Sequence, residues 1–222
     1  HHPALPLYTE EDAYRSLHRL KPVAFGQSFI VADTFEFRFD VAGHILGSAT
    51  VRAIMPDGTV VRFSGDLGRP NHPVLLPSAP VGDADYIVVE STYGDRTHQP
   101  DDPLERLAAL IDRTVRRGGK LVVPAFAVDR TEVLLYDLAR LARAGRLPHV
   151  PVFVDSPMAL AALRVYRAAL TEGRADIRPE HHGDVDLFDV PNLEENETPD
   201  GSKRISHRAD PAIVIAGAGM AT

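Results

Sequence analysis

Hydrophobic and polar residues alternate in the first part of the chain, which is typical of strands that are buried on one face. Residues 35–41 read Phe-Glu-Phe-Arg-Phe-Asp-Val, so every second side chain is apolar. Two further segments, 50–55 and 59–64, flank Pro56-Asp57-Gly58, and an Asp-Gly pair in this position indicates a hairpin. We therefore predict that this part of the chain is mainly antiparallel β-structure.

The pattern changes after residue 86, where short and continuous apolar runs replace the alternation. These runs cover residues 86–89, 121–123, 152–154 and 213–215, and segments with a helical period separate them. Continuous apolar strands are typical of a parallel sheet that is covered on both faces. The fold class predicted for the chain is therefore α/β, with a parallel sheet in its second part.

Capping residues set the boundaries of the predicted helices. We expect the helices over residues 9–20, 103–117, 130–144 and 157–170. The predicted N-caps are Thr9, Asp102, Asp129 and Ser156. Proline follows two of these N-caps at the first helical position, where its missing N–H costs nothing.

Charge is distributed unevenly along the 222 residues, whose formal net charge is −7. Residues 172–210 carry 11 Asp or Glu against 5 Lys or Arg, and Asn192–Gly201 has no apolar period. We predict that the segment 172–210 is a loop-rich, solvated insertion. The negative charge argues against a general nucleic-acid coat, because binding to phosphates depends on Lys and Arg.

Composition narrows the candidate chemistry. The chain has no cysteine, which excludes disulfides, thiol nucleophiles and Cys-ligated zinc and leaves His, Asp and Glu as metal ligands. The same absence fits a reducing, cytoplasmic setting. No apolar stretch of about 18 residues and no signal peptide is visible, so we expect no membrane partner.

Three Gly-containing turns place a polar side chain directly after or between strands, and these side chains are His44, Asp66 and Glu90. Glycine permits tight turns and the close approach of an ion or a phosphate. An imidazole with carboxylates and no thiolate is the ligand set of a hydrolytic zinc centre. Each residue also has a structural explanation: a hydrogen-bonded His, an Asx turn at Asp66, or capping of Ser91 or Thr92 by Glu90.

The sequences around these three residues resemble, in order, successive motifs of the metallo-β-lactamase-fold nucleases. They read Asp40-Val-Ala-Gly-His-Ile-Leu-Gly-Ser-Ala49, Phe63-Ser-Gly-Asp-Leu-Gly-Arg69 and Glu90-Ser-Thr-Tyr-Gly-Asp-Arg96. Later segments at Pro124–Arg130, Val154–Met158 and Ile213–Met220 look like the β-CASP insertion of the same proteins. The chain is most similar to the bacterial and archaeal RNases that resemble the cleavage-and-polyadenylation endonuclease. The resemblance implies part of a metallo-β-lactamase αββα sandwich over residues 1–95, followed by a β-CASP domain over residues 96–222.

The resemblance also implies a di-zinc phosphodiesterase that cleaves RNA with metal-activated water. A set of His and carboxylate ligands could also accept Mn²⁺. In this family the His that matches His44 ligates one zinc ion, and the Asp that matches Asp66 bridges both. The Glu that matches Glu90 orients a later His, which helps to protonate the leaving oxygen. We therefore expect His44, Asp66 and Glu90 to converge on one cavity.

Two further residues are candidates for binding the substrate. Arg130 and Ser156 lie where predicted helices begin after parallel strands, which is where open α/β sheets bind ligands. We expect them either to contact the RNA backbone or to serve only as a capping or ion-pair residue. RNA is the expected partner, and a homodimer is left open.

Three departures from the family pattern qualify these expectations. A His-x-His-x-Asp-His signature would precede His1 and two later His motifs would follow Thr222, so we expect an internal fragment with two metal ligands. Because a zinc site needs at least three protein ligands, this piece alone is expected to hold zinc poorly and to be inactive. Asp129 stands where the family usually has Gly, and we interpret it as an N-cap. Ala218 replaces a residue that is often Ser.

Other functions are weighed against the zinc-dependent ribonuclease. A DNA nuclease of the same superfamily would keep the fold and change the polymer, although the β-CASP motifs look more like those of the RNA branch. A catalytically inactive scaffold that binds RNA or a partner is a third reading, and the presence of His44, Asp66 and Glu90 argues against it. A small-molecule hydrolase is disfavoured, because a β-CASP-like insertion has no purpose over a compact substrate.

Overall fold

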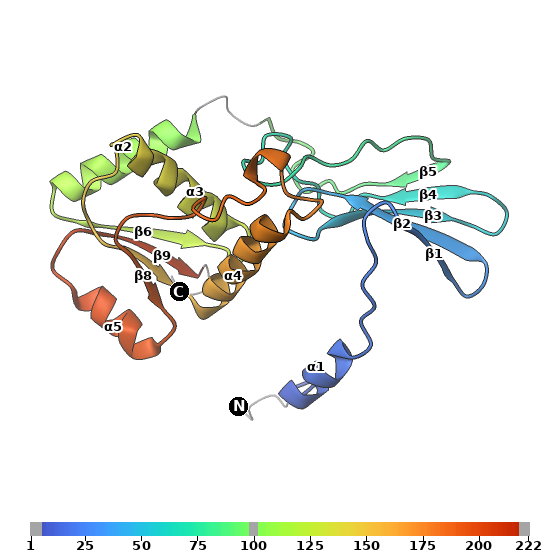
Figure 1. The fold of residues 1–222 in the computed structure, drawn as a ribbon, viewed down its shortest axis with the longest axis horizontal. Coiled ribbons are helices and arrows are strands. Elements are labelled where there is room, and N and C mark those ends of the chain that lie inside the picture. Colours follow the sequence, from blue (N-terminus) through green and yellow to red (C-terminus); the bar gives the residue numbers. More distant parts are fainter. Residues whose placement is uncertain (1–5, 98–101, 218–222) are drawn as a thin grey trace.

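The computed structural model describes residues 6–97 and 102–217, and its two sheets lie at opposite ends of the long axis of the molecule (Figure 1). The strands are β1 Ser28–Val31, β2 Phe35–Val41, β3 Ala49–Ile54, β4 Val60–Phe63, β5 Tyr86–Val88, β6 Lys120–Ala125, β7 Val152–Asp155, β8 Leu193–Asn196 and β9 Ala212–Gly217. The α-helices are α1 Glu10–Leu17, α2 Pro103–Arg116, α3 Arg130–Arg143, α4 Pro157–Glu172 and α5 Pro199–His207, and a 3₁₀ turn covers Pro179–His181. Ala218, which replaces a residue that is often Ser in the family, lies outside the described residues.

The first sheet has the strand order β1-β2-β3-β4-β5. Its first four strands are antiparallel, and β5 runs parallel to β4. Ile54 pairs with Val60 across the predicted hairpin, whose Gly58 has a φ of +88°. The prediction of antiparallel structure is therefore confirmed, whereas the short edge strand β1 was not predicted.

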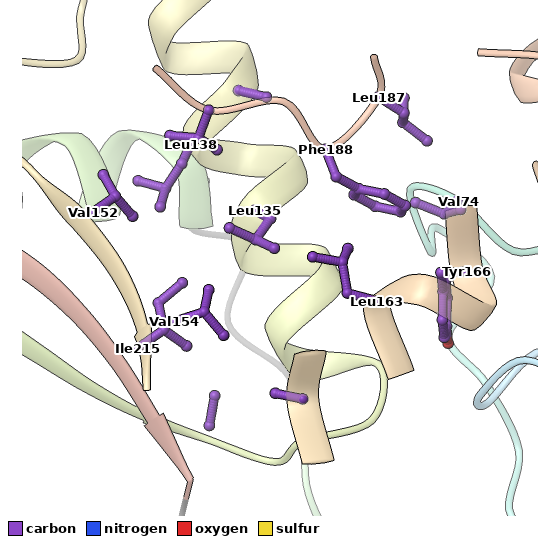
Figure 2. Packing of buried hydrophobic residues seen from close by; sticks show 14 of the residues in the cluster. Val74, Leu135, Leu138, Val152, Val154, Leu163, Tyr166, Leu187, Phe188 and Ile215 are labelled. Atoms are coloured by element: carbon purple, nitrogen blue, oxygen red, sulfur yellow. The ribbon is translucent and has the colours of Figure 1, made fainter. Parts of the chain in front are cut away.

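The second sheet is entirely parallel, with the strand order β6-β9-β7-β8. Its two central strands are buried on both faces. Val152, Val154 and Ile215 pack in one cluster with residues of α2, α3 and α4 (Figure 2). Phe153 packs on the other face with Ile205 of α5. This arrangement confirms the prediction of a parallel sheet covered on both faces.

The acidic segment 172–210 is rich in loops, as predicted, but it is not a solvated insertion, so that part of the prediction was wrong. It contains β8, which pairs with β7 through its backbone, and α5, which covers one face of the sheet. Ile177 is almost completely buried in the main core. Leu187 and Phe188 are buried in the same core (Figure 2). Most of the acidic side chains are exposed, and the few apolar ones follow no helical or strand period, so the sequence pattern does not reveal this packing.

Three of the four predicted N-caps are confirmed. The side chains of Thr9, Asp102 and Ser156 each accept a hydrogen bond from a backbone N–H in the first turn of their helix. The prediction for Asp129 was wrong, because its side chain caps nothing and its φ is +73°. Helix α1 lies apart from both sheets and buries no residue (Figure 1). No described helix combines the length and the apolar character that crossing a bilayer would require.

Candidate active site

His44 lies in a tight loop between β2 and β3. Its backbone N–H and that of Ile45 both donate to Ser48 Oγ, at 3.0 and 3.2 Å. Gly43 has a φ of +68°, and a Cβ at this position would overlap the backbone oxygen of Leu76. Only glycine therefore fits at position 43 without strain. The imidazole of His44, the next residue in this loop, is half-exposed.

Asp66 lies in the turn that follows β4, and this turn packs directly on the His44 loop. The N–H of Gly68 donates to the backbone oxygen of Ala42 over 2.9 Å. A Cβ at Gly68 would overlap the backbone of Gly43. The two turns can approach this closely only because both positions are glycine, and the approach brings Asp66 toward His44.

Glu90 holds the Asp66 turn from the end of β5. Its Oε1 accepts the N–H of Leu67 over 2.7 Å, and its own N–H donates to Ser64 Oγ over 3.0 Å. A carboxylate that accepts the N–H next to Asp66 restricts the backbone of that residue. The interpretation of Glu90 as a cap for Ser91 or Thr92 therefore finds no support in these contacts.

The atoms Nε2 of His44 and Oδ2 of Asp66 are 3.9 Å apart. This distance is too long for a hydrogen bond, and it lies within the roughly 4 Å that two ligands of one zinc ion can span at about 2.0–2.2 Å each. Within residues 6–97 and 102–217, no group of three His, Cys, Asp or Glu side chains is placed to hold a metal. The chain therefore fits zinc as the supplier of two ligands of a larger set.

A cavity of about 1250 Å³ lies between the part of the molecule that contains the first sheet and the part that contains the second. His44, Asp66 and Glu90 all line this cavity. Its opposite wall comes from the second part and includes Phe126 at the end of β6 and Arg130 at the start of α3. The arginines that line the cavity are Arg69, Arg96, Arg130 and Arg140. Five carboxylate residues line it as well, Asp66, Glu90, Asp102, Asp129 and Asp137, so the charge of the wall is mixed and contacts with a phosphate would come from the guanidinium groups.

The two predicted substrate residues have different surroundings. Arg130 is exposed in the cavity, and its side chain has no ion pair or hydrogen bond with another described residue. Ser156 is not among the residues that line the cavity. Its hydroxyl is buried and accepts a hydrogen bond from the N–H of Ala159 over 3.3 Å. Of the two expected roles for Ser156, this contact corresponds to helix capping.

Asp129 belongs to a buried polar network that sequence analysis did not detect. Its Oδ1 accepts hydrogen bonds from Tyr166 Oη over 2.9 Å and from His72 Nε2 over 3.0 Å. These partners are 37 and 57 residues away in the sequence. Neither has a local signature, because a Tyr inside a helix and a His in a loop each have ordinary structural explanations. Burial and the nearby Asp129 raise the pKa of the Tyr166 hydroxyl, so this hydroxyl keeps its proton and acts as a donor.

Glu132 lies one helical turn beyond Asp129 and is completely buried. Neither of its carboxylate oxygens has a hydrogen-bond partner among the described residues. Burial raises the pKa of Glu132 to about 7, and the charge of Asp129 adds to this effect, while the nearby backbone N–H groups act in the opposite direction. Glu132 stands three residues after Asp129, which is the ordinary spacing of a capping box, so the sequence gives no sign that its carboxyl is buried.

Comparison with known proteins relates the chain to β-CASP proteins and to ribonucleases. Residues 131–222 match the family description of the Beta-Casp domain. The chain is 33% identical over 217 residues to Ribonuclease TTHA0252 of Thermus thermophilus, and the match covers 97% of this chain and 49% of that protein. It is 26% identical over 217 residues to an RNase J-like protein of Methanocaldococcus jannaschii, with 96% and 49% covered.

A eukaryotic relative shows a similar likeness. The chain is 29% identical over 219 residues to Cleavage and polyadenylation specificity factor subunit 3 of Dictyostelium discoideum, which covers 96% of this chain and 27% of that protein. The chain thus spans about half the length of the bacterial and archaeal relatives that it matches, and a smaller share of the Dictyostelium protein.

Proposed function

This chain belongs to the β-CASP family of metallo-β-lactamase-fold proteins, and from this premise we propose that it is part of a zinc-dependent ribonuclease. The observation that carries the proposal is the position of His44 and Asp66, whose side chains approach within 3.9 Å in a cavity that also contains Arg130. A pair of metal ligands in the same cavity as an arginine is suited to hydrolysis of a phosphodiester, because a metal ion can activate water and a guanidinium group can bind phosphoryl oxygens.

The residues of this chain have separate tasks in the proposed reaction. His44 Nε2 and Asp66 Oδ2 would hold the metal, and Glu90 keeps Asp66 in place through the N–H of Leu67. Zinc, when bound, supplies an activated water and neutralises negative charge on phosphoryl oxygens. Arg130 binds a backbone phosphate of the substrate and orients the scissile bond within the cavity. We infer that Mn²⁺ can replace zinc, because a set of His and carboxylate ligands accepts both ions.

RNA is the proposed substrate. The relatives from Thermus and Methanocaldococcus carry ribonuclease or RNase in their names, and they match almost the whole of this chain. We further propose a cytoplasmic location, on the ground that the chain has no cysteine. The homodimer stays a prediction.

The experiment compares a 5′-labelled RNA oligonucleotide with a DNA oligonucleotide of the same sequence as substrates for the full-length gene product. We expect cleavage of the RNA, loss of activity on chelation, and recovery when Zn²⁺ or Mn²⁺ is added back. Faster cleavage of the DNA would assign the protein to DNA instead. Binding of RNA without cleavage under any metal condition would contradict the enzyme and favour a scaffold.

A further inference from the structure

Asp129 has a backbone conformation that favours glycine. Its φ is +73° and its ψ is −51°, and the N–H of Arg130 donates to the backbone oxygen of Val128 over 3.0 Å. These values describe a γ-turn of the rarer form, which is strained for any residue with a Cβ. Since α3 begins at Arg130, the turn sets the direction in which Arg130 enters the cavity.

The carboxylate of Asp129 compensates for this strain. It is buried, and a single oxygen accepts from both His72 and Tyr166, at 3.0 and 2.9 Å. Hydrogen bonds to a buried carboxylate are stronger than those between neutral groups. The hydrogen bonds of the Asp129 side chain therefore stabilise a turn whose backbone conformation is unfavourable by itself.

His72 is a defined donor in this network. The backbone N–H groups of Val74 and Leu75 both donate to Nδ1 of His72, at 3.1 and 2.9 Å. Nδ1 consequently carries no proton, and the proton on Nε2 is directed at Asp129. The backbone oxygen of His72 in turn accepts from Arg178 Nε over 2.7 Å. The loop after Asp66 is thus tied to the segment 172–210.

Tyr166 connects the same carboxylate to the His44 loop. Its hydroxyl donates to Asp129 and accepts the N–H of Leu46 over 3.1 Å. A second tie lies next to it, because the N–H of Gly47 donates to Oδ2 of the buried Asp176 over 2.7 Å. The loop that carries His44 is therefore held by two side chains from the second part of the molecule, through adjacent backbone N–H groups.

We propose that His72, Asp129 and Tyr166 form one positioning unit, which fixes the His44 loop and the Arg130 turn relative to each other across the cavity. His72 and Asp129 line the cavity, but both are buried and hydrogen-bonded to each other, so the unit acts through His44 and Arg130 and not by contact with the substrate. The proposal rests on the proposed ribonuclease function for its catalytic consequence, while its structural content is independent of catalysis. It also accounts for an aspartate at a position where the family usually has glycine.

The test combines hydrogen exchange with kinetics in the full-length gene product. Tyr166→Phe removes only the hydroxyl that links Leu46 to Asp129. Asp129→Gly removes the carboxylate and at the same time relieves the backbone strain, so this variant is expected to fold. Asp129→Asn keeps an oxygen acceptor and serves as the conservative variant. Tyr136→Phe is the matched control, because the hydroxyl of Tyr136 has no hydrogen bond to a described residue.

We expect Tyr166→Phe to speed amide exchange at Leu46 by about two- to tenfold, the effect of one lost hydrogen bond. Asp129→Gly is expected to lower kcat/KM for RNA by about tenfold or more, with Asp129→Asn retaining most of the activity. Tyr136→Phe should change neither quantity.

Exchange at Leu46 that is unchanged in Tyr166→Phe would overturn the positioning unit, and so would wild-type kcat/KM in Asp129→Gly. If the wild-type protein cleaves no RNA, the ribonuclease function fails, and the exchange rates of the same variants still support or overturn the unit.

Discussion

The free energy of unfolding of the wild type is expected to fall as the pH rises, because Glu132 ionises. Replacement of Glu132 by Gln should abolish this dependence on pH. Glu132 is completely buried, and neither carboxylate oxygen has a hydrogen-bond partner among the described residues. A charged carboxylate at this position is costly, because it loses its hydration by water and lies in an apolar interior. Gln has nearly the same shape and never ionises, so the variant isolates the contribution of the charge.

The magnitude follows from the shift of the pKa. The carboxyl of Glu132 titrates near 4.5 when exposed in the unfolded chain and near 7 in the folded protein. Between these values the unfolded chain has lost the proton and the folded protein has kept it, so the free energy of unfolding falls as the pH rises. At about 1.4 kcal/mol for each pH unit, the loss amounts to about 3 kcal/mol and is complete above pH 7.

The assay is urea unfolding of the wild type and the variant at a series of pH values from about 5 to 8. We expect the wild type to lose about 2.5 kcal/mol more than Glu132→Gln across this range. Glu172→Gln, an exposed position on α4, controls for the removal of one carboxylate. Parallel pH profiles for the wild type and Glu132→Gln would contradict a raised pKa for Glu132, because they would mean that this carboxyl is ionised and stabilised in the folded state.

Three further predictions concern the core, the His44 loop and the cavity. Phe188→Ala is expected to lower the free energy of unfolding by about 3–5 kcal/mol, whereas Val185→Ala, at an exposed position nearby, should change it little; thermal unfolding measures both. Gly43→Ala should cost about 1–3 kcal/mol through overlap with the neighbouring backbone, and Gly58→Ala, which has a similar φ but open space, should cost less by chemical denaturation. Arg130→Gln should weaken RNA binding and reduce the salt slope of log K by about 1 in a filter-binding series; an unchanged slope would exclude a phosphate contact.

Much of the fold follows from local patterns. The period of two over residues 35–41 and the Asp-Gly turn predict the antiparallel sheet, and the apolar runs predict β6, β7 and β9. Pro103 and Pro157, each after a capping side chain, mark the starts of α2 and α4. These features depend on residues that are close in the sequence, so the sequence displays them directly.

The second half of the acidic segment could not be predicted in the same way. Strand β8 is an edge strand that joins the sheet through backbone hydrogen bonds, so its sequence Leu-Glu-Glu-Asn carries no apolar period. Helix α5 contains Gly201, whose Cα lies directly against the side chain of Asn196. Glycine normally argues against a helix, and here the close approach requires it.

The candidate site was predicted in part. The glycines beside His44 and Asp66 are visible in the sequence, and the structure explains them by the direct packing of the two turns. Asp129 was misread, because an Asp before a helix is ordinarily an N-cap. Its actual partners, His72 and Tyr166, come from other segments, so only the folded chain reveals them.

The most direct test of the central claim is the single-turnover rate of RNA cleavage by Asp66→Asn in the full-length gene product, with zinc present. Asp112→Asn on α2, outside the cavity, is the control for the same chemical change. We expect the rate to fall by about 100-fold or more in Asp66→Asn and to stay at the wild-type value in Asp112→Asn. A wild-type rate in Asp66→Asn would contradict a site in which Asp66 and His44 hold the catalytic metal.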